Sequence, residues 1–594
     1  MTLKSMNNIL LSKWSVLFIA ISAFLIFIPS LKGPFILDDQ NTIIYNELRT
    51  SPEKIESYSI VDHIRERTFS QWTFLVNEKL SPKVTPSYFR VVNYLLHLLN
   101  GFLIYLFVSL LWRKTLNNGQ EHVAGLIAMM IFLVHPLQTQ AVNYITQRMT
   151  LLSSGFSLLA MLSFLKIRTS PKPDTYAWVL RIGFILSIVL AVLSKPIAIC
   201  IFPFILVLEV LIVRKKEAKA QWISIMLIFI FGIITLGSSI QGPIDTPRIG
   251  RLDYLLTQSI VSFKYFGLLL WPNDLSIDHF QPIWTEIAPF KLALSLAGHL
   301  SIILFAWLMR SKYSIISLGI ALTYISFLPE SGLIPLKDIM VEHRMYMPMI
   351  GIAIITSTIT TPLHRRKWFL PILVLISLSL MLRTSIRNFD WSDKLTLWST
   401  TLETNPSSSR AMYSIGHIYL LKGDTAEALS SFSKALDGNP RHVPSLAASA
   451  LINTNQGNLS SAEKLLNRAL ELEPLDVVSL QNMGYLLESK NQLKESLKFY
   501  KRAVKFNKGT PDPHIDLGTA YLRLKRTDKA IEQFEKAINL GSESARLHNN
   551  LGFAYQILGD ASLAKYHYLR ALEIDSTYEL SRQNLISLPD STEE

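Results

Sequence analysis

Two adjacent carboxylates, Asp38 and Asp39, follow the first hydrophobic segment of the chain, residues 14–31. A carboxylate within hydrogen-bond reach of a hydroxyl group can act as a general base and remove its proton. At the edge of a membrane, such a base could assist attack on a lipid-anchored substrate. The alternatives are a solvated pair of loop acids or, on weaker grounds, a site for a divalent cation. The pair is therefore the predicted catalytic element.

Candidate binding residues lie at the ends of later hydrophobic segments. Arg148 and Lys195 could pair with a phosphate, because guanidinium and ammonium groups donate hydrogen bonds to phosphate oxygens. For Lys195 the alternative is a lysine that reaches from an apolar segment to the membrane surface, and a lone histidine such as His135 is more often structural. The predicted binding residues are His135, Arg148, Lys195, Glu330, Glu342, His343 and Arg344, with His97 and His279 as supporting residues.

One predicted span carries a polar stripe. Its members recur at spacings of three and four residues and so share one face of a helix: Arg90, Asn93, His97 and Asn100. Interhelical hydrogen bonds are the favoured interpretation for the two asparagines, and the role of His97 stays open. No spacing of His, Cys and Asp along the chain resembles a structural zinc site.

The elements that position these residues are expected to be membrane spans. The chain has 594 residues, of which 49% are hydrophobic and 17% charged. Since about 20 apolar residues span a bilayer, we predict a membrane domain over residues 1–383 with an outer loop over 32–88. The predicted spans, about eleven in number, are residues 14–31, 89–111, 122–138, 150–166, 177–194, 197–213, 221–240, 289–309, 314–328, 346–362 and 368–382.

Basic residues set the expected orientation, since cytoplasmic loops of membrane proteins carry an excess of Lys and Arg. Lys4 and Lys13 place the N-terminus in the cytoplasm, and clusters such as residues 365–367 mark later cytoplasmic loops. Residues 252–271 are predicted to form an amphipathic helix on the outer surface. The acidic pair, the basic candidates and the C-terminal half then all face the periplasm or the lumen of an organelle.

The charge and the cysteine content exclude two classes of protein. A net charge of +13 could suggest a nucleic-acid partner. However, the basic excess lies in the membrane half, where topology explains it, and the second half is nearly neutral. No nucleic-acid partner is predicted. The single cysteine, Cys200, rules out an internal disulfide.

The second half carries a repeat of 34 residues. Small residues recur at this period, with a bulky residue beside them: Ala435, Ala469, Ala503, Ala537 and Ala571; Gly484, Gly518 and Gly552; Phe432, Leu466, Tyr500, Phe534 and Tyr568. This is the tetratricopeptide pattern. We predict a connecting partial-repeat helix over 384–406, five repeats over 407–576 and a polar tail over 577–594. Stacked helix pairs form a concave groove, which is predicted to bind a peptide or protein. The alternative is a rigid spacer or an oligomerisation platform.

Together these motifs resemble the transmembrane and tetratricopeptide-repeat O-mannosyltransferases, and their bacterial relatives, of the C-type glycosyltransferase superfamily. The resemblance covers nearly the whole chain. It rests on the acidic pair, the polar stripe, the repeats and the segments 135–148, 194–195, 270–279 and 329–344. One departure is Gln140, where the His-Pro motif of the family leads us to expect Glu.

The resemblance implies an all-α protein: a polytopic helical membrane domain followed by a tetratricopeptide-repeat α-solenoid. It implies a glycosyltransferase that moves a monosaccharide, with mannose expected, from a polyprenyl- or dolichyl-phosphate carrier to Ser or Thr hydroxyls of a protein on the non-cytoplasmic side. The acidic pair would supply the catalytic carboxylate, and the repeat groove would hold the acceptor. Inversion at the sugar is expected, because no second nucleophilic carboxylate is evident. No cofactor is predicted, and a divalent cation is the one candidate. A bacterial inner membrane is favoured over the endoplasmic reticulum.

Two other functions remain open at this stage. The chain could be a non-enzymatic membrane scaffold that displays the repeats to recruit proteins. It could also transport a lipid-linked glycan, but transporters place ionisable groups near the middle of the bilayer, often in pseudo-symmetric repeats, and neither feature is clear here.

Overall fold

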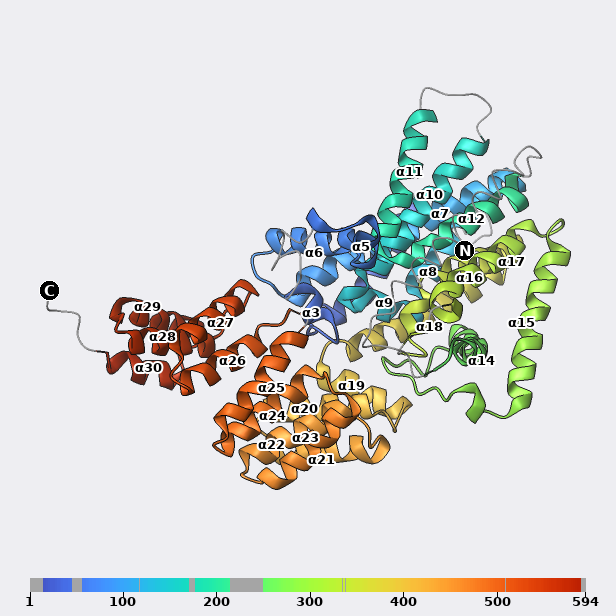
Figure 1. Ribbon diagram of the computed structural model, residues 1–594. Helices are drawn as coiled ribbons and strands as arrows, with labels where there is room; N and C mark the ends of the chain where they lie inside the picture. The colour runs from blue at the N-terminus through green and yellow to red at the C-terminus, as the bar shows by residue number, and fades with distance from the viewer. Residues whose placement is uncertain are drawn as a thin grey trace. The chain divides into compact units, whose positions relative to one another are not determined.

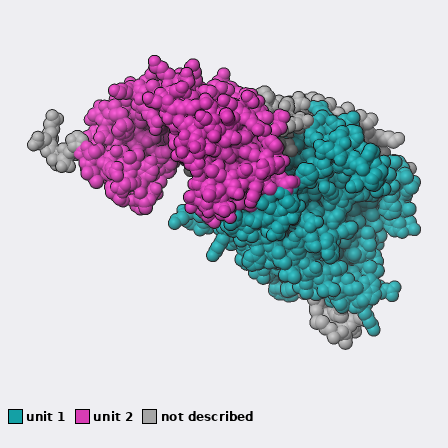
Figure 2. Space-filling view, turned by 90° about the horizontal axis from the view of Figure 1, so that it is seen from below, with its two compact units in different colours: residues 1–39, 57–406 teal, residues 40–56, 407–594 magenta. Residues whose placement is uncertain are grey.

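The computed structural model describes residues 14–44, 56–116, 118–169, 177–213, 249–333, 335–336, 338–507 and 509–588. Within these residues the regular secondary structure is entirely helical, so the predicted all-α fold is confirmed. The chain divides into two compact units, residues 1–39 with 57–406 and residues 40–56 with 407–594, which Figure 2 shows in different colours.

The first unit is built of helices, most of them apolar (Figure 1). Its α-helices are α2 (Trp14–Phe27), α5 (Ile60–Arg65), α6 (Thr68–Leu80), α7 (Pro86–Thr115), α8 (Glu121–Val134), α9 (Thr139–Asn143), α10 (Arg148–Thr169), α11 (Ala177–Ser194), α12 (Ile201–Leu208), α14 (Arg251–Leu270), α15 (Pro289–Met309), α16 (Ser314–Leu328), α17 (Pro348–Thr360), α18 (Phe369–Asp390) and α19 (Lys394–Thr404). The short helix α3 (Asp39–Ile43) begins at the end of the loop after α2. Tighter or wider helical turns at Pro136–Gln138, Ile145–Gln147, Pro196–Cys200, Pro329–Leu333 and Glu342–Met345 interrupt these helices.

The described helices support a multi-pass membrane protein. Six are long and apolar enough to cross a bilayer: Pro86–Thr115, Ile145–Thr169, Pro196–Val213, Pro289–Met309, Ser314–Gly332 and Phe369–Asp390. A bent pair, Glu121–Val134 with Pro136–Asn143, is a seventh candidate, and two shorter apolar helices cover Trp14–Ser30 and Trp178–Ser194. The predicted span 221–240 lies outside the described residues, and the predicted span 346–362 falls on the shorter helix α17. The total number of spans therefore remains a prediction.

Small residues and one proline set the local geometry of this unit. The bent pair turns by 57° at Pro136, which lacks a backbone N–H and cannot continue the preceding helix. Between α16 and α17 two glycines meet, and a Cβ added at Gly319 would lie 2.7 Å from the carbonyl oxygen of Gly351. Such contacts let helices approach closely where no hydrophobic effect drives them together in lipid.

The second unit is an array of five helix pairs followed by a single helix. The pairs are α20 (Ser409–Leu421) with α21 (Thr425–Gly438), α22 (Val443–Asn455) with α23 (Leu459–Leu472), α24 (Val477–Ser489) with α25 (Leu493–Phe506), α26 (Asp512–Arg523) with α27 (Thr527–Asn539), and α28 (Ala545–Leu558) with α29 (Ala561–Ile574). A Cβ at Gly518 would lie 2.5 Å from the ring of Phe534. The recurring glycine and its bulky neighbour mark the crossing in four of the five pairs, at Gly416, Gly484, Gly518 and Gly552. In the pair of α22 with α23 the small residue at this position is Ala450.

The stretch predicted as a polar tail begins with a helix, α30 (Glu579–Ile586). Ser581 Oγ and Asn584 Nδ2 each donate to Asn549 Oδ1 of α28 at 3.0 Å. A final helix with a polar outer face is the expected cap of a repeat array, because the last pair has no further neighbour to cover it.

Candidate functional site

Asp39 is buried and holds the acidic loop in place. None of its surface is exposed. Its Oδ1 accepts hydrogen bonds from Thr146 N at 2.8 Å and Thr146 Oγ1 at 2.7 Å, and its Oδ2 accepts one from Ile36 N at 3.1 Å. Both carboxylate oxygens therefore face protein donors, and they tie the loop after α2 to the turn Ile145–Gln147 that precedes α10.

Asp38 is the exposed member of the pair. Its Oδ2 accepts a hydrogen bond from the Tyr144 hydroxyl at 3.3 Å, and its N–H donates to the same hydroxyl oxygen at 3.2 Å. The residue before it, Leu37, has a φ of 52°, a left-handed conformation that costs a non-glycine residue about 1–3 kcal/mol and clusters at functional sites. The geometry thus presents the Asp38 carboxylate outward and keeps that of Asp39 inward.

The ionisation of Asp39 should make the free energy of unfolding depend on pH. Burial raises the pKa of Asp39 from its ordinary 3.8 to about 6, and the hydrogen bonds from Thr146 offset only part of this rise. Between these two values the folded protein holds a proton that the unfolded chain has lost. The free energy of unfolding should therefore fall by about 3 kcal/mol as the pH rises through this window and change no further above it.

Thermal unfolding of the wild type and of Asp39→Asn between about pH 4 and pH 7 isolates this contribution as the difference between the two curves. Asp38→Asn is the matched control and should keep the wild-type pH profile. A wild-type stability that rises with pH relative to Asp39→Asn across this window would contradict the assignment.

Arg90 of α7 clamps the same loop from inside the bundle. It is fully buried. Its guanidinium donates to the carbonyl oxygens of Asn143 at 3.1 Å and Pro34 at 2.7 Å, and also to that of Gly33. A Cβ at Gly33 would collide with Arg90 and with the carbonyl oxygen of Trp391. This close fit means that only glycine is accommodated at the point where the loop crosses the helices.

Arg148, predicted to contact a phosphate, has a different environment from the one expected. It is fully buried, and its Nε donates to Asn93 Oδ1 at 3.0 Å. The two terminal nitrogens donate to Thr73 O at 3.1 Å, to Asn77 Oδ1 at 2.7 Å and to Phe89 O at 3.0 Å. Because neutral protein oxygens already take these donors, the geometry favours Arg148 as a residue that positions α10 and does not support direct contact with a ligand.

The histidine of the polar stripe is also used within the protein. His97 is buried, with Nδ1 at 3.0 Å from the Tyr346 hydroxyl and Nε2 at 3.2 Å from Leu133 O. Asn100 Nδ2 donates to Leu151 O at 2.9 Å. These hydrogen bonds join α7 to neighbouring segments of the first unit. Interhelical hydrogen bonding is the interpretation favoured for the two asparagines, and the geometry extends it to His97.

His135 lies at the bend between α8 and α9 and has partners for both ring nitrogens. Its Nδ1 accepts the N–H of Leu137 at 3.2 Å, so the network assigns the proton to Nε2, which donates to Leu269 O at 3.0 Å. The structural alternative for this histidine is therefore the one that the geometry favours.

A buried ion pair lies where α11 ends. Lys195 Nζ is 2.8 Å from Glu330 Oε1, and the side chains are 7% and 18% exposed. Lys195 Nζ also donates to Thr150 Oγ1 on α10 at 3.1 Å. The two residues lie just after the predicted spans 177–194 and 314–328, which are far apart in sequence, and the structure brings them together as one charged centre.

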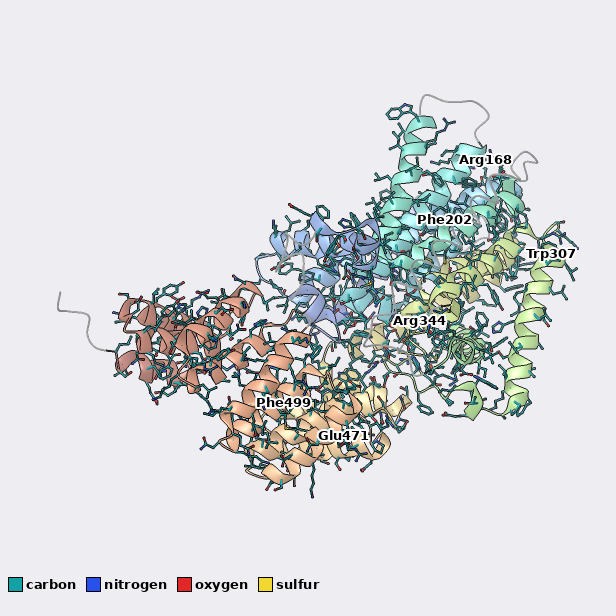
Figure 3. All side chains as sticks on the ribbon, viewed as in Figure 1. Arg168, Phe202, Trp307, Arg344, Glu471 and Phe499 are labelled. Carbon is teal, nitrogen blue, oxygen red and sulfur yellow. The ribbon has the colours of Figure 1, made fainter. Side chains whose placement is uncertain are left out.

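Arg344 and His343 complete this centre. Arg344, labelled among the helices of the first unit in Figure 3, donates to Ile339 O at 2.9 Å and Asp338 O at 2.6 Å. The charges of Lys195 and Arg344 both act on Glu330. Burial, with the neighbouring positive charge of Lys195, lowers the pKa of His343 to about 3, so its imidazole is neutral. We refer to Lys195, Glu330, His343 and Arg344 as the basic cluster.

Glu342 and His279 form a separate pair beside the basic cluster. Glu342 is fully buried, and its Oε1 accepts from Ser276 N at 2.5 Å and lies 2.9 Å from His279 Nε2. This pair fixes the segment that follows α14 against the turn Glu342–Met345. It therefore supports the position of His343 and Arg344 from the side.

Tyr144 links the acidic loop to the basic cluster. Its hydroxyl contacts Asp38, and its ring centroid lies 6.4 Å from that of His343. His343 is held in turn through its backbone N–H, which donates to Gln140 Oε1 at 2.7 Å. Gln140, which replaces the expected Glu, thus supplies the acceptor oxygen that this contact requires.

Several polar atoms of this region are buried and have no hydrogen-bond partner among the described residues. They are Glu330 Oε2, Ser331 Oγ and His343 Nδ1. Buried polar atoms are nearly always paired in native proteins, so unpaired atoms beside a charged cluster point to a ligand or to water.

The two carboxylates of the acidic pair are not arranged to chelate a divalent cation. Both oxygens of Asp39 accept hydrogen bonds from protein donors, which leaves Asp38 as the only open carboxylate of the two. In the part of the chain that the structure describes, no group of three or more His, Cys, Asp or Glu side chains could hold a metal ion. Metal dependence stays a prediction to be tested.

Sequence reasoning did not single out Tyr144, Thr146 or Thr150, although each contacts a predicted site residue. All three lie within or just after the segment 135–148, which contributes to the resemblance. The residue type alone does not mark an uncharged hydroxyl side chain as part of a site. The one feature of the sequence that could have indicated these residues is their position in a polar stretch between two apolar segments.

Fold and site together define a multi-pass helical membrane protein that carries a tetratricopeptide-repeat array. The family models described as tetratricopeptide repeat match residues 392–442, 419–482, 477–510 and 545–578, and one described as TPR repeat matches residues 518–559. The predicted presence of tetratricopeptide repeats is thus confirmed, and their number and bounds stay a prediction. Among solved structures, a thermophilic TPR protein from Thermus thermophilus aligns with 30% of this chain and 98% of its own, at 20% identity and a TM-score of 0.28.

About two thirds of the chain is similar to protein O-mannosyl-transferases, which confirms the predicted resemblance. It is 25% identical to Protein O-mannosyl-transferase TMTC4 of Mus musculus, over 68% of this chain and 63% of the relative. It is 23% identical to Protein O-mannosyl-transferase F38B6.6 of Caenorhabditis elegans, over 68% and 59%, and 24% identical to Protein O-mannosyl-transferase TMTC3 of Mus musculus, over 63% and 44%. The matched region spans less than two thirds of the length of each of these relatives.

Proposed function

We propose that this protein is an inverting membrane glycosyltransferase. It takes a monosaccharide, with mannose favoured, from a polyprenyl- or dolichyl-phosphate carrier and transfers it to Ser or Thr hydroxyls of an acceptor protein on the non-cytoplasmic side. The observation that carries the proposal is the exposed carboxylate of Asp38, linked through Tyr144 to the basic cluster. The similarity to protein O-mannosyl-transferases supports it.

The acidic loop supplies the base. The Asp38 carboxylate takes the proton of the acceptor hydroxyl while that oxygen forms a bond to the anomeric carbon. Tyr144 and the buried Asp39 position Asp38 for this step, because one contacts it and the other fixes its loop. The proton leaves the acceptor as the new glycosidic bond forms.

The basic cluster binds the leaving group. As the bond between the anomeric carbon and the phosphate oxygen breaks, its electron pair moves to that oxygen, and the phosphodiester becomes a phosphomonoester with one more negative charge. Lys195 and Arg344 stabilise this charge in a preorganised site. Glu330 keeps Lys195 in place, and the neutral His343 adds a hydrogen-bond donor without another charge. Attack from the side opposite the leaving phosphate inverts the anomeric carbon.

The repeat array serves the acceptor in this proposal. A solenoid offers a concave surface on which an extended segment can lie, and the resemblance implies that this surface holds the acceptor protein. Repeats and site then share the periplasm or the lumen. A bacterial inner membrane remains the favoured location, with the endoplasmic reticulum as the alternative.

The test is a transfer assay with the full chain in lipid nanodiscs. A polyprenyl-phosphate sugar labelled in the sugar and a Ser/Thr-containing peptide are supplied, and mass spectrometry and NMR follow the product. We expect the label on a hydroxyl, with an anomeric configuration opposite to that of the donor. Retention of configuration would contradict the mechanism. Movement of the lipid-linked sugar across a proteoliposome without transfer would favour the transporter hypothesis, and neither activity would favour the scaffold.

A further inference from the structure

Arg67 is a cation of the outer loop that the predicted site does not include. It stands directly before α6, is exposed, and has a φ of 54°, a left-handed conformation unusual for a residue with a Cβ. Its Nη1 donates to the sulfur of Met149 at 3.0 Å. A thioether is a weak acceptor, so a stronger acceptor could readily replace this contact.

The first turn of α6 is fastened to the segment that carries Lys195. Ser70 Oγ donates to Ser194 O at 2.9 Å, one residue before the lysine. Gln71 reinforces the turn before the helix, since its Nε2 donates to Glu66 O at 2.7 Å. These bonds hold Arg67 beside the basic cluster, and the charges of Arg67 and Arg344 both act on the Lys195 ammonium.

The region therefore gathers three cations, Lys195, Arg344 and Arg67, around the carboxylate of Glu330, and a second acid, Asp338, acts on Arg344. Glu330 compensates Lys195. Arg344 has backbone carbonyl oxygens as partners, and Arg67, among the residues that the structure describes, has a sulfur atom and no carboxylate within ion-pair distance. Cations held close together repel each other unless an anion joins them. The unpaired Glu330 Oε2 and His343 Nδ1 lie in the same region.

Two other arginines of the first unit have structural roles, and their burial and hydrogen-bond partners can be compared with those of Arg67. Arg90 and Arg148 are fully buried and donate to protein carbonyl and amide oxygens. Arg67 differs from both, because it is exposed and holds only a weak acceptor. Its charge is therefore available to a ligand that enters from the outer side.

From these contacts we infer that Arg67 binds the phosphate of the lipid carrier together with Lys195 and Arg344. This inference rests on the proposed function for the identity of the ligand, a lipid-linked phosphomonoester or diester. The planar guanidinium leaves Met149 and donates two parallel N–H bonds to phosphate oxygens, a geometry that lysine lacks.

The test measures binding of undecaprenyl phosphate to the full chain in nanodiscs, without any sugar transfer. Arg67→Gly removes the guanidinium and suits the left-handed backbone, so loss of fold is not expected. We expect Arg67→Gly to weaken binding by on the order of 10- to 100-fold and Arg67→Lys to restore part of it. Arg65→Gln is the matched control, since Arg65 is an exposed arginine of the same loop that pairs with Asp62 and Glu66, and it should bind as the wild type does.

Three further ligands identify what Arg67 recognises. Undecaprenol, which lacks the phosphate, should bind equally weakly to wild type and Arg67→Gly. Inorganic phosphate should compete with undecaprenyl phosphate only at high concentration, and phosphatidylglycerol should not compete. Competition by phosphatidylglycerol at equal concentration would overturn the inference in favour of a general anionic-lipid contact.

The outcomes for Arg67 and for the proposed function are distinguishable. If Arg67→Gly binds undecaprenyl phosphate as tightly as the wild type does, the role of Arg67 is overturned. This holds whether or not the protein transfers sugar. If the wild type binds the carrier in an Arg67-dependent manner but transfers no sugar, the inference stands and the proposed function fails. With an active enzyme, Arg67→Gly should raise KM for the donor, and unchanged kcat and KM would again overturn the inference.

Discussion

Asp38→Asn is expected to lower the rate of sugar transfer by about 10²- to 10⁴-fold, the range that a general base contributes. The substitution keeps the shape of the side chain and an acceptor oxygen for the Tyr144 hydroxyl but removes the basic oxygen that takes the proton. Because Asp38 is exposed and the Asn oxygen can still accept the hydrogen bond of the buried Tyr144 hydroxyl, the protein should fold and bind the donor normally. Transfer of a labelled sugar to a peptide, measured with donor binding on the same nanodisc preparation, gives both quantities.

Two controls separate this effect from general loss of charge or of structure. Glu286→Gln removes an exposed carboxylate from the segment between α14 and α15 and should leave transfer unchanged. Asp39→Asn should reduce transfer through loss of loop position, and it should also lower thermal stability, because its amide nitrogen would face the Ile36 N–H donor. Full activity in Asp38→Asn would refute the assignment of this residue as the base.

Lys195→Met should both unfold part of the protein population and strongly reduce the rate of sugar transfer. It leaves the Glu330 carboxylate without its partner in a largely buried position, and breaking a buried ion pair in this way typically costs about 3–5 kcal/mol. It also removes a charge that stabilises the leaving phosphate, an effect of about 10²–10³ in rate. Thermal unfolding in detergent and transfer per folded molecule measure the two losses separately.

The double substitution Lys195→Met with Glu330→Leu distinguishes structure from chemistry. Replacing both members of a buried pair by apolar residues is often neutral or stabilising, so the double variant should recover most of the stability and none of the activity. Arg168→Met, which breaks the contact between Arg168 Nε and Glu209 Oε2 at 2.9 Å, is the matched control. It should lose stability and keep transfer per folded molecule. A double variant that regains transfer would show that the pair has only a structural role.

The stability and the activity predictions depend on each other through one loop. The residues from Gly33 to Asp39 are held by Arg90, by Thr146 and by their own turn. The pH dependence assigned to Asp39 reports on this loop without any substrate. A variant that changes that profile should also change the rate, because the loop carries Asp38.

Much of the fold follows from local patterns in the sequence. The 34-residue recurrence of small and bulky residues predicts helix pairs that cross at Gly518 and Phe534, and the structure has them in contact. Apolar runs predict the long helices, since a segment of this composition is stable only when buried in lipid or protein. Pro136 predicts a break in a helix, and the break is there. Each of these signals depends on residues close together in the chain.

The roles of the charged residues depend on contacts that no local pattern contains. The sequence by itself determines that carboxylates, arginines and histidines stand at the ends of apolar segments, and it marks the set from Asp38 to Arg344 as candidates. Only the tertiary structure decides that Asp38 faces outward and Asp39 inward, that Arg148 and His135 have protein partners, and that Lys195 meets Glu330. The physical reason is that desolvation and hydrogen-bond pairing decide whether an ionisable group is structural or reactive, and both come from segments that meet only when the helices pack.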